Sequence, residues 1–347
     1  MSSKFFAAVT ATFLLASGAH AQSILTAETA APNTTPGISI ISLSEAAAKE
    51  GVADIQVTSG QTLTNSVQNV AEGKSDIAAA PYILPFLLSR GVGPYAKLGK
   101  DTGAELAGNL VALYTYRISV QGLFAYDSAG INGWDGLEGK TIFNGPPRGA
   151  ALTNARLLIK TNAGLDEGTG YTGIQVNWGQ AVKTIQDGSA DAFVLPMAFP
   201  DPRVTAGLSS GKMSIFSVSK EIYESDAFAN VAKLPGTVSF SIPVAEMGYG
   251  EGITIVSEDD TFRGPATVGA DIVNVNMDFD LAKSLTAAFI KNIEPIYHAK
   301  APFMPGTWHG EVDPAITDMC GNNPIKYPPG AVAAWEDAGY TIPDCAK

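Results

Sequence analysis

The sequence is short of charge, and of basic residues in particular. Only 16% of its 347 residues are charged, against about a quarter in an average soluble protein, and 22 Lys and Arg stand against 34 Asp and Glu. Binding nucleic acid through its phosphates requires a basic patch, which the sequence does not contain. Disorder requires low hydrophobicity, whereas 46% of the residues are hydrophobic. These deficits exclude a nucleic-acid partner and a disordered chain, and the length allows roughly two domains.

The sequence also lacks an apolar run that is long enough to span a membrane. The stretch after Lys4 covers residues 5–16, about 12 residues where a transmembrane helix needs roughly 20. Ala19-His20-Ala21 follows, which is the small-residue pattern of a signal-peptide cleavage site. Residues 1–21 are therefore predicted to be a secretory signal peptide, and the remaining chain is expected to be exported and not inserted in a membrane.

Cysteine is almost absent, because Cys320 and Cys345 are the only two in the chain. Export to an oxidising compartment favours a structural disulfide between them, which would hold the proline-rich tail in place. Two unpaired thiols or a metal site are the alternatives.

Histidine and catalytic motifs are equally scarce. After the predicted leader only His298 and His309 remain, and their spacing does not fit a zinc site. Residues 207–211 match G-x-S-x-G, the nucleophile elbow of hydrolases, but a proline-rich segment precedes them and a strand-like segment follows. The elbow needs the opposite order, so a loop before a strand is predicted here. We predict no enzyme, no metal and no cofactor, with a secreted hydrolase as a remote alternative.

The most informative pattern is an internal repeat. Residues 55–61 read IQVTSGQ, and residues 174–180 read IQVNWGQ. Further matches follow each copy, at a spacing about four residues shorter in the second, which is roughly one helical turn. The residues shared downstream are Val67, Val70, Gly73, Asp76 and Pro81, which match Val182, Ile185, Gly188, Asp191 and Pro196.

Each copy is predicted to form a strand, a helix and a second strand. Leu63, Val67 and Val70 fall on one helical face, and Gly73 stands where a left-handed residue ends a helix. Short apolar runs follow and suit buried strands that end at the prolines. Such βαβ units have parallel strands, so the fold class is predicted to be α/β.

In open α/β sheets, ligands bind beyond the carboxyl ends of the strands. Hydroxyl, amide and aromatic side chains stand at these ends in both copies, which is the composition of a binding cleft between two lobes. They are Ser59, Gln61, Thr62 and Tyr82 in the first copy, with Gly60 between them, and Asn177, Trp178 and Phe199 in the second.

A second strand-to-helix turn lies between the copies. A strand over residues 141–143 is followed by a Gly/Pro turn and a helix that Gly164 ends. A helix amino terminus favours anions, and Arg148 and Gly149 stand at that point. The Arg148 guanidinium is matched to a carboxylate, although a solvent-facing arginine on a turn fits the sequence equally well.

With these elements in order, the chain resembles the TAXI group of solute receptors of TRAP transporters. The supporting motifs are G-x-x-D-x-A at residues 73–78, D-x-L-x-G-K at 135–140, Gly-Pro-Pro at 145–147, and the segments 188–192 and 329–331. The chain departs from the family at two places. Residues 31–37, including Thr34, stand where the family has a glycine-rich loop with tyrosine, and Arg148 replaces a small residue.

The resemblance implies a two-lobed periplasmic-binding fold, type II-like, each lobe a mostly parallel sheet flanked by helices, with the ligand cleft between the lobes. Residues 22–117 and 245–347 are expected to form the first lobe, and residues 118–244 the second. The predicted ligand-binding residues are Thr34, Ser59, Gly60, Gln61, Thr62, Tyr82, Arg148, Gly149, Asn177, Trp178 and Phe199.

The function implied by the resemblance is that of a periplasmic receptor, which captures a small organic acid or an acidic amino acid for TRAP membrane subunits. A receptor of an ABC importer and a ligand sensor of the same fold that is not involved in transport are the alternatives.

Overall fold

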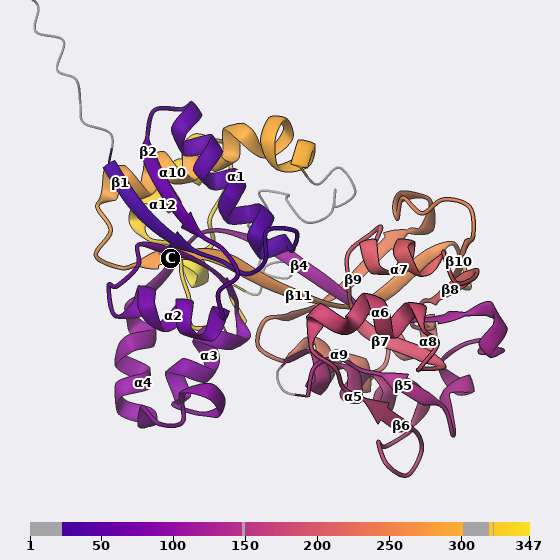
Figure 1. Ribbon diagram of the computed structural model, residues 1–347. Helices are drawn as coiled ribbons and strands as arrows, with labels where there is room; N and C mark the ends of the chain where they lie inside the picture. Colours follow the sequence, from indigo (N-terminus) through magenta and orange to yellow (C-terminus); the bar gives the residue numbers. More distant parts are fainter. Residues whose placement is uncertain (1–22, 148–149, 301–318, 322) are drawn as a thin grey trace, which may run out of the picture.

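The computed structural model describes residues 23–147, 150–300, 319–321 and 323–347. Two lobes are joined by two long strands, β4 (Leu110–Tyr126) and β11 (Thr261–Asn274) (Figure 1). The first lobe holds β1 (Ser23–Glu28), α1 (Thr35–Lys49), β2 (Ala53–Thr58), α2 (Leu63–Ala71), β3 (Ile77–Pro81), α3 (Ile83–Arg90), α4 (Gly99–Gly108), α10 (Phe279–Asn292) and α12 (Pro329–Asp337). The second lobe holds β5 (Thr141–Phe143), α5 (Ala150–Ala163), β6 (Thr172–Ile174), α6 (Ala181–Gln186), β7 (Ala192–Met197), α7 (Pro202–Gly207), β8 (Met213–Phe216), α8 (Lys220–Tyr223), α9 (Asp226–Ala232), β9 (Thr237–Pro243) and β10 (Ile253–Val256).

The described strands belong to one mixed sheet, whose central order is β2-β1-β3-β11-β4-β7-β5-β6. β2, β1 and β3 are parallel in the first lobe, as are β6, β5 and β7 in the second. The strands β4 and β11 run antiparallel to β7 and β3 respectively, and to each other. The predicted two-lobed α/β fold is confirmed, and the joining strands add to each lobe an antiparallel part that the sequence did not indicate.

The internal repeat is visible in the order of the strands. In the first lobe α2 connects β2 to β3, with β1 between them, and in the second α6 connects β6 to β7, with β5 between them. α2 has nine residues, whereas α6 has six and follows a short 3-10 helix, η4 (Trp178–Gln180). Gly73 and Gly188 follow these helices with φ of 70° and 67°, the left-handed conformation that the sequence predicted.

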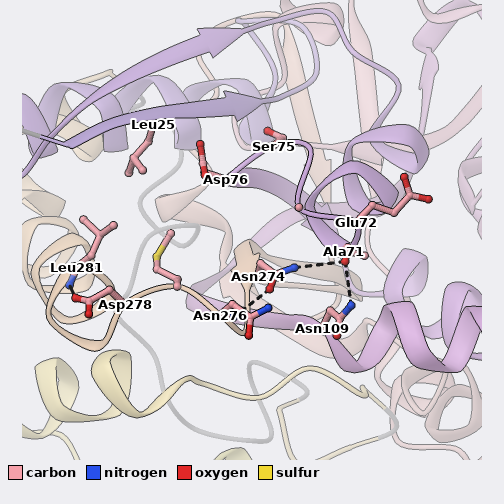
Figure 2. Close-up of a pocket in the computed structure, with 12 residues that line it drawn as sticks. Leu25, Ala71, Glu72, Ser75, Asp76, Asn109, Asn274, Asn276, Asp278 and Leu281 are labelled. Carbon is pink, nitrogen blue, oxygen red and sulfur yellow. Dashed lines mark hydrogen bonds between the residues drawn. The ribbon is translucent and has the colours of Figure 1, made fainter.

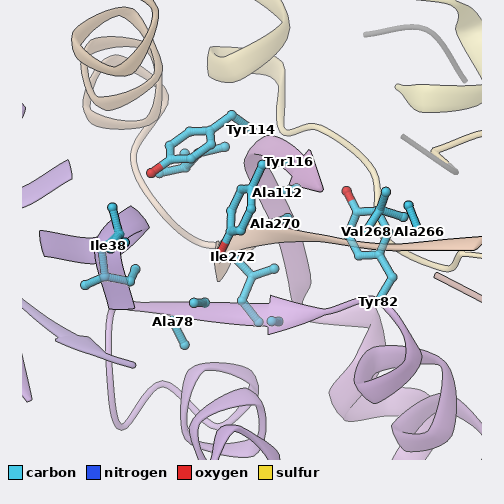
Figure 3. Packing of buried hydrophobic residues seen from close by; sticks show 14 of the residues in the cluster. Ile38, Ala78, Tyr82, Ala112, Tyr114, Tyr116, Ala266, Val268, Ala270 and Ile272 are labelled. Atoms are coloured by element: carbon cyan, nitrogen blue, oxygen red, sulfur yellow. The ribbon is translucent and has the colours of Figure 1, made fainter. Parts of the chain in front are cut away.

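The core of the first lobe packs helices on both faces of the sheet (Figure 1). Val67 and Val70 of α2 are fully buried, as their spacing predicted, and α10 packs against α1 and β4. Small side chains of three neighbouring strands, Ala78, Ala112 and Ala270, lie among larger ones in this core (Figure 3). These small residues let the strands and helices approach closely.

A buried carboxylate lies in this core, where β4 and β11 pair. Asp271 is fully buried; Ser39 Oγ donates to Oδ2 at 2.7 Å, Tyr116 OH donates to Oδ1 at 2.9 Å, and Tyr114 OH also donates to Oδ2. The Tyr297 hydroxyl lies 3.1 Å from that of Tyr114. Burial raises the pKa of Asp271 to about 7, although the three hydroxyl bonds act in the opposite direction. The network joins β4, β11, α1 and a π-helix, η6 (Ile293–His298).

The carboxyl-terminal tail packs on the first lobe. Cys320 and Cys345 form a disulfide with their Cα atoms 5.1 Å apart, which confirms the predicted pairing. Ala112 N donates to Lys326 O, and Tyr327 N donates to Ala346 O, so the tail is bound to β4 and to itself. α12 packs against α10 and buries the Trp335 indole fully.

Replacing both cysteines by serine is expected to lower the free energy of unfolding by about 3 kcal/mol, because the disulfide closes a loop with a sequence separation of 25. Urea unfolding of the double variant measures the change, and the wild-type protein unfolded under reducing conditions serves as the control. An unchanged unfolding midpoint would show that packing alone holds the tail.

The prediction that Pro196 ends its strand is wrong. β7 continues to Met197, and Pro196 is paired with Gln121 of β4. On the edge of β7 that faces away from β4, β5 pairs only with Ala192 and Phe193. The missing N–H of Pro196 therefore leaves no bond to β5 unmade.

Residues 208–212 form the predicted loop before a strand, and a short helix, α7, precedes them. Pro202 occupies the first turn of α7, where its fixed φ suits a helix and its missing N–H costs nothing. The Asp201 side chain caps the helix by accepting a bond from Arg203 N. β8 follows the G-x-S-x-G residues, as predicted, so the strand-then-helix order of a nucleophile elbow is not found here.

The chain passes between the lobes along strands rather than loops. β4 pairs with β11 from Leu110 to Val120 and with β7 from Val120 to Ala125. β10 pairs with β8 in the second lobe, so the chain returns to the first lobe along β11. The exact lobe boundaries, after residues 117 and 244, stay a prediction.

Candidate functional site

The predicted ligand-binding residues of the first lobe gather at the carboxyl ends of β1 and β2. Gly60 N donates to Ala30 O at 3.0 Å and Gln61 N to Thr29 O at 2.9 Å, so the two loops are bound to each other. Thr34 caps α1 at the same edge, where its Oγ1 accepts from Gly37 N at 3.3 Å. Ser59 is half-buried, and Gly60, Gln61 and Thr62 are exposed.

Two of the predicted residues are buried. Tyr82 is fully buried at the start of α3, and its hydroxyl donates to Met319 Sδ at 2.9 Å. Phe199 is 7% exposed and makes an edge contact with Phe262 at a centroid distance of 5.0 Å. The structure therefore places both rings in the core, where Phe199 helps to fix the loop after β7.

Arg148 and Gly149 lie outside the described residues. The helix that they were predicted to precede is α5, and Gly164 follows it with a φ of 71°, as the sequence predicted. Leu152, Ala155 and Ile159 form its buried face. The strand before the turn, β5, has the predicted bounds of residues 141–143.

A polar network that the sequence analysis missed lies at the ends of β5 and β6. Glu167 accepts bonds from Arg156 Nε and Nη2, each at 2.9 Å, and from Asn144 Nδ2 at 2.7 Å. Gln175 Nε2 donates to Asn144 Oδ1 at 2.8 Å. The Arg156 bond is the main reason why the pKa of Glu167 is below its usual range. The network fixes Asn144, which is fully buried, directly after β5.

Asn177 and Trp178 follow β6 and are both exposed. The guanidinium of Arg203 lies over the Trp178 ring, 5.4 Å from its centroid, and is itself paired with Asp201. Burial acts to lower the pKa of Arg203, but the Asp201 carboxylate outweighs it and holds that pKa above its usual value. The sequence analysis also missed Arg203, because no local pattern connects it to Trp178.

The cavity in Figure 2 lies at the opposite edge of the first lobe, near the amino ends of β1 and β3. Its volume is about 370 Å³, and Leu25, Met277 and Leu281 form its apolar part. Carboxylate and amide side chains supply its polar lining: Glu72, Asp76, Asp278, Asn109, Asn274 and Asn276. Nothing in the sequence predicted a pocket here, and it is separate from the predicted ligand-binding loops.

The part of the chain that contains the repeat matches a known protein family. The NMT1-like family matches residues 28–243, which is more than half of the sequence. The chain belongs to the NMT1-like family. The match covers both copies of the repeat in this NMT1-like protein. Membership of the TAXI group stays a prediction.

Several solved structures resemble this NMT1-like protein distantly. A putative sulfonate-binding periplasmic protein of an ABC transporter from Methylobacillus flagellatus is 13% identical, with a TM-score of 0.46, 79% of this chain covered and 69% of that chain. The aliphatic sulphonate-binding protein of Escherichia coli is 12% identical, with a TM-score of 0.44 and coverages of 83% and 80%. A TRAP solute-binding protein from Desulfovibrio salexigens with bound orotic acid is 10% identical, with a TM-score of 0.45 and coverages of 92% and 85%. No curated protein matches the chain.

Among residues 23–147, 150–300, 319–321 and 323–347, none of the helices is both long enough and apolar enough to cross a bilayer. Within the same part of this NMT1-like protein, no three His, Cys, Asp or Glu residues are grouped so that they could hold a metal ion. The predicted leader and His309 lie outside the described residues.

Proposed function

We propose that this NMT1-like protein is a periplasmic solute receptor that binds a small organic acid or acidic amino acid between its lobes and delivers it to a TRAP-type importer. The observation that carries the proposal is the matched strand order of the two lobes. Because of this order, β2 and β6, the first strands of the two repeat copies, occupy matching places in their lobes. The loops after them lie at the carboxyl ends of the strands, where α/β sheets bind ligands. The protein catalyses no reaction on its ligand.

Ligand binding and lobe closure are coupled in such a receptor. A ligand that contacts both lobes stabilises the closed conformation by the difference between its affinities for the closed and open states. The half-buried Ser59 and the exposed Gln61 and Thr62 contribute hydroxyl and amide groups from the first lobe, and Asn177 and Trp178 contribute from the second. β4 and β11 are the connections that must bend when the lobes approach.

The acidic character of the ligand rests on Arg148 and the start of α5. A helix of 14 residues presents free N–H groups and about half a positive charge at its amino terminus. A guanidinium next to it supplies two parallel N–H donors for a carboxylate. The net charge of −12 does not attract an anion, so such local donors must do so.

Arg148→Ala is expected to weaken binding of an acidic ligand by about a hundredfold, because its charge-assisted pair with the ligand carboxylate is lost. Thermal-shift titration with a panel of dicarboxylates, monocarboxylates and acidic amino acids measures the effect on the ligand-induced rise in Tm. Lys97→Ala removes an exposed positive charge elsewhere and is the control. Equal ligand-induced shifts in Arg148→Ala and the wild type would contradict this role for Arg148.

The membrane partner is tested separately. A receptor of an ABC importer with the same two-lobed fold is the alternative, and the genes beside this one distinguish the two transporter classes. Genes for TRAP membrane subunits beside the gene for this chain would support the proposal, whereas genes for an ATPase and a permease would favour the ABC alternative. A solitary gene beside a signalling protein would favour a sensor.

A further inference from the structure

Trp178 is an indole held at the surface of the second lobe. Its side chain is 45% exposed, although large aromatic side chains are usually well buried. It stands in η4, directly after β6, at the carboxyl edge where the repeat predicts ligand contacts. An aromatic ring in this position keeps part of its surface available to a ligand.

The ring is supported from within the lobe by Arg203, whose guanidinium lies over it at 5.4 Å, within the range of a cation–π contact. The Arg203 side chain is 21% exposed and is fixed by three hydrogen bonds. Its Nε and Nη2 donate to the Asp201 carboxylate at 3.0 and 2.7 Å, and Nη2 also donates to Pro196 O. The cation is therefore held in one orientation under the indole.

Asp201, which fixes Arg203, is itself fixed. Its side chain is almost fully buried, and it accepts bonds from Arg203 N at 2.8 Å and Ala198 N at 3.2 Å. Its backbone N–H donates to the Tyr249 hydroxyl at 2.9 Å. A chain of contacts thus runs from the loop after β7 through Asp201 and Arg203 to Trp178, and it joins the segments that follow β7 and β6, two strands with β5 between them.

Building on the proposed function, we infer that Trp178 is the stacking surface for a planar, conjugated acid and that Arg203 is the positioning residue that holds the indole in place. A flat ring gains contact with an indole over its whole face, whereas a puckered saturated ring of the same size touches it at a few atoms. The receptor therefore selects aromatic or heteroaromatic carboxylates over saturated ones. The proposed function fixes only the acidic group of the ligand, and this inference adds the shape of its body.

Two matched pairs of probes test the inference: furan-2-carboxylate with tetrahydrofuran-2-carboxylate, and benzoate with cyclohexanecarboxylate. In each pair the carboxylate and the ring size are kept, and the ring changes from planar and conjugated to puckered and saturated. Isothermal titration with the mature protein is expected to give a Kd about tenfold lower for the planar member, since aromatic stacking typically contributes a factor of about three to ten. Planar probes are also expected to quench the fluorescence of Trp178.

Variants at Trp178 provide the decisive comparison. Trp178→Leu keeps an apolar side chain of moderate size at a half-exposed position, so folding is expected to be unaffected. The ratio of the affinity for the planar probe to the affinity for its saturated partner is expected to fall to about one. Trp178→Tyr is expected to keep part of the preference. An unchanged ratio in Trp178→Leu would overturn the inference and would leave the exposed indole as a candidate for contact with another protein.

Arg203→Met tests the positioning role. It keeps the length of the side chain but removes the charge and the bonds to Asp201, so the ratio is expected to fall about threefold, with a change in Trp178 emission. If Arg203 is only structural, the variant lowers Tm but leaves the ratio at its wild-type value, which would overturn that part of the inference.

The outcome also separates this inference from the function on which it rests. If wild-type protein binds saturated and planar acids equally, the inference fails and the acid receptor stands. If it binds none of these probes and no member of the organic-acid panel, the proposed function fails.

Discussion

Between pH 4 and pH 8, Asp271 is expected to lower the free energy of unfolding of the wild-type protein by about 4 kcal/mol. Asp271→Asn is expected to abolish this pH dependence. The pKa of the buried Asp271 carboxyl is raised from 3.8 to about 7, chiefly by burial. Between these two values the folded protein keeps the proton that the unfolded chain has lost. Because the folded state then binds more protons, its stability decreases as pH rises, and the decrease ends above pH 7.

Urea unfolding at several pH values, with wild type and Asp271→Asn side by side, measures this effect. The difference between the two proteins is the useful quantity, because exposed carboxylates contribute equally to both. Asp101→Asn makes the same change of charge on an exposed position of α4 and is the control. Parallel pH profiles for wild type and Asp271→Asn would contradict the buried, proton-binding state of this side chain.

Gly269→Ala is expected to lower the free energy of unfolding by about 3 kcal/mol, the upper part of the usual range for overpacking. Gly269 lies in β11 between β3 and β4, where it is paired with Pro81 and Tyr116. A Cβ at this position would collide with the backbone carbonyl oxygen of Ala80 and lie 2.6 Å from Cδ1 of Ile118. A backbone oxygen in a central strand cannot move aside without disturbing the sheet.

Gly108→Ala is the matched control, because a Cβ at the exposed end of α4 would have no atom within 4 Å. Alanine is the better helix former, so this variant is expected to be as stable as wild type or slightly more stable. Chemical unfolding of both variants gives the comparison. Equal stability of the two would show that β11 and β3 can separate at this point without cost.

The elements that the sequence predicted well are those in which local signals agree. The helical spacing of Val67 and Val70, the glycines at 73 and 188, and the strand before the Gly-Pro-Pro turn all define short segments in which pattern and turn chemistry point to one conformation. β10 and β11 have no such local signals, because their partners β8, β3 and β4 come much earlier in the sequence. The continuation of β7 through Pro196 was not predicted for a similar reason, because it depends on where β5 ends.

For the candidate site, the repeat indicated which strand ends to examine but not which side chains are accessible there. Tyr82 and Phe199 follow their strands as expected, yet their exposure depends on Met319 and Phe262, which no local pattern connects to them. The contact between Trp178 and Arg203 is equally invisible in the sequence. Asp271 was missed for a further reason, since a single carboxylate in an apolar strand has no partner motif until Ser39 and Tyr116 are folded against it.

The position of β11 in the sheet has a consequence for how the chain is assembled as it is synthesised. β3 is made early, but the neighbour that covers it, β11, comes only after the whole second lobe, and the bond between Ser39 and Asp271 joins residues 232 positions apart. Until then β3 is an unpaired edge, the kind of strand that invites association with other chains. Closing so long a loop is slow compared with forming local contacts. The sheet of the first lobe therefore stays incomplete during synthesis. In the second lobe, β5, β6 and β7 are consecutive strands, so their part of the sheet can assemble first.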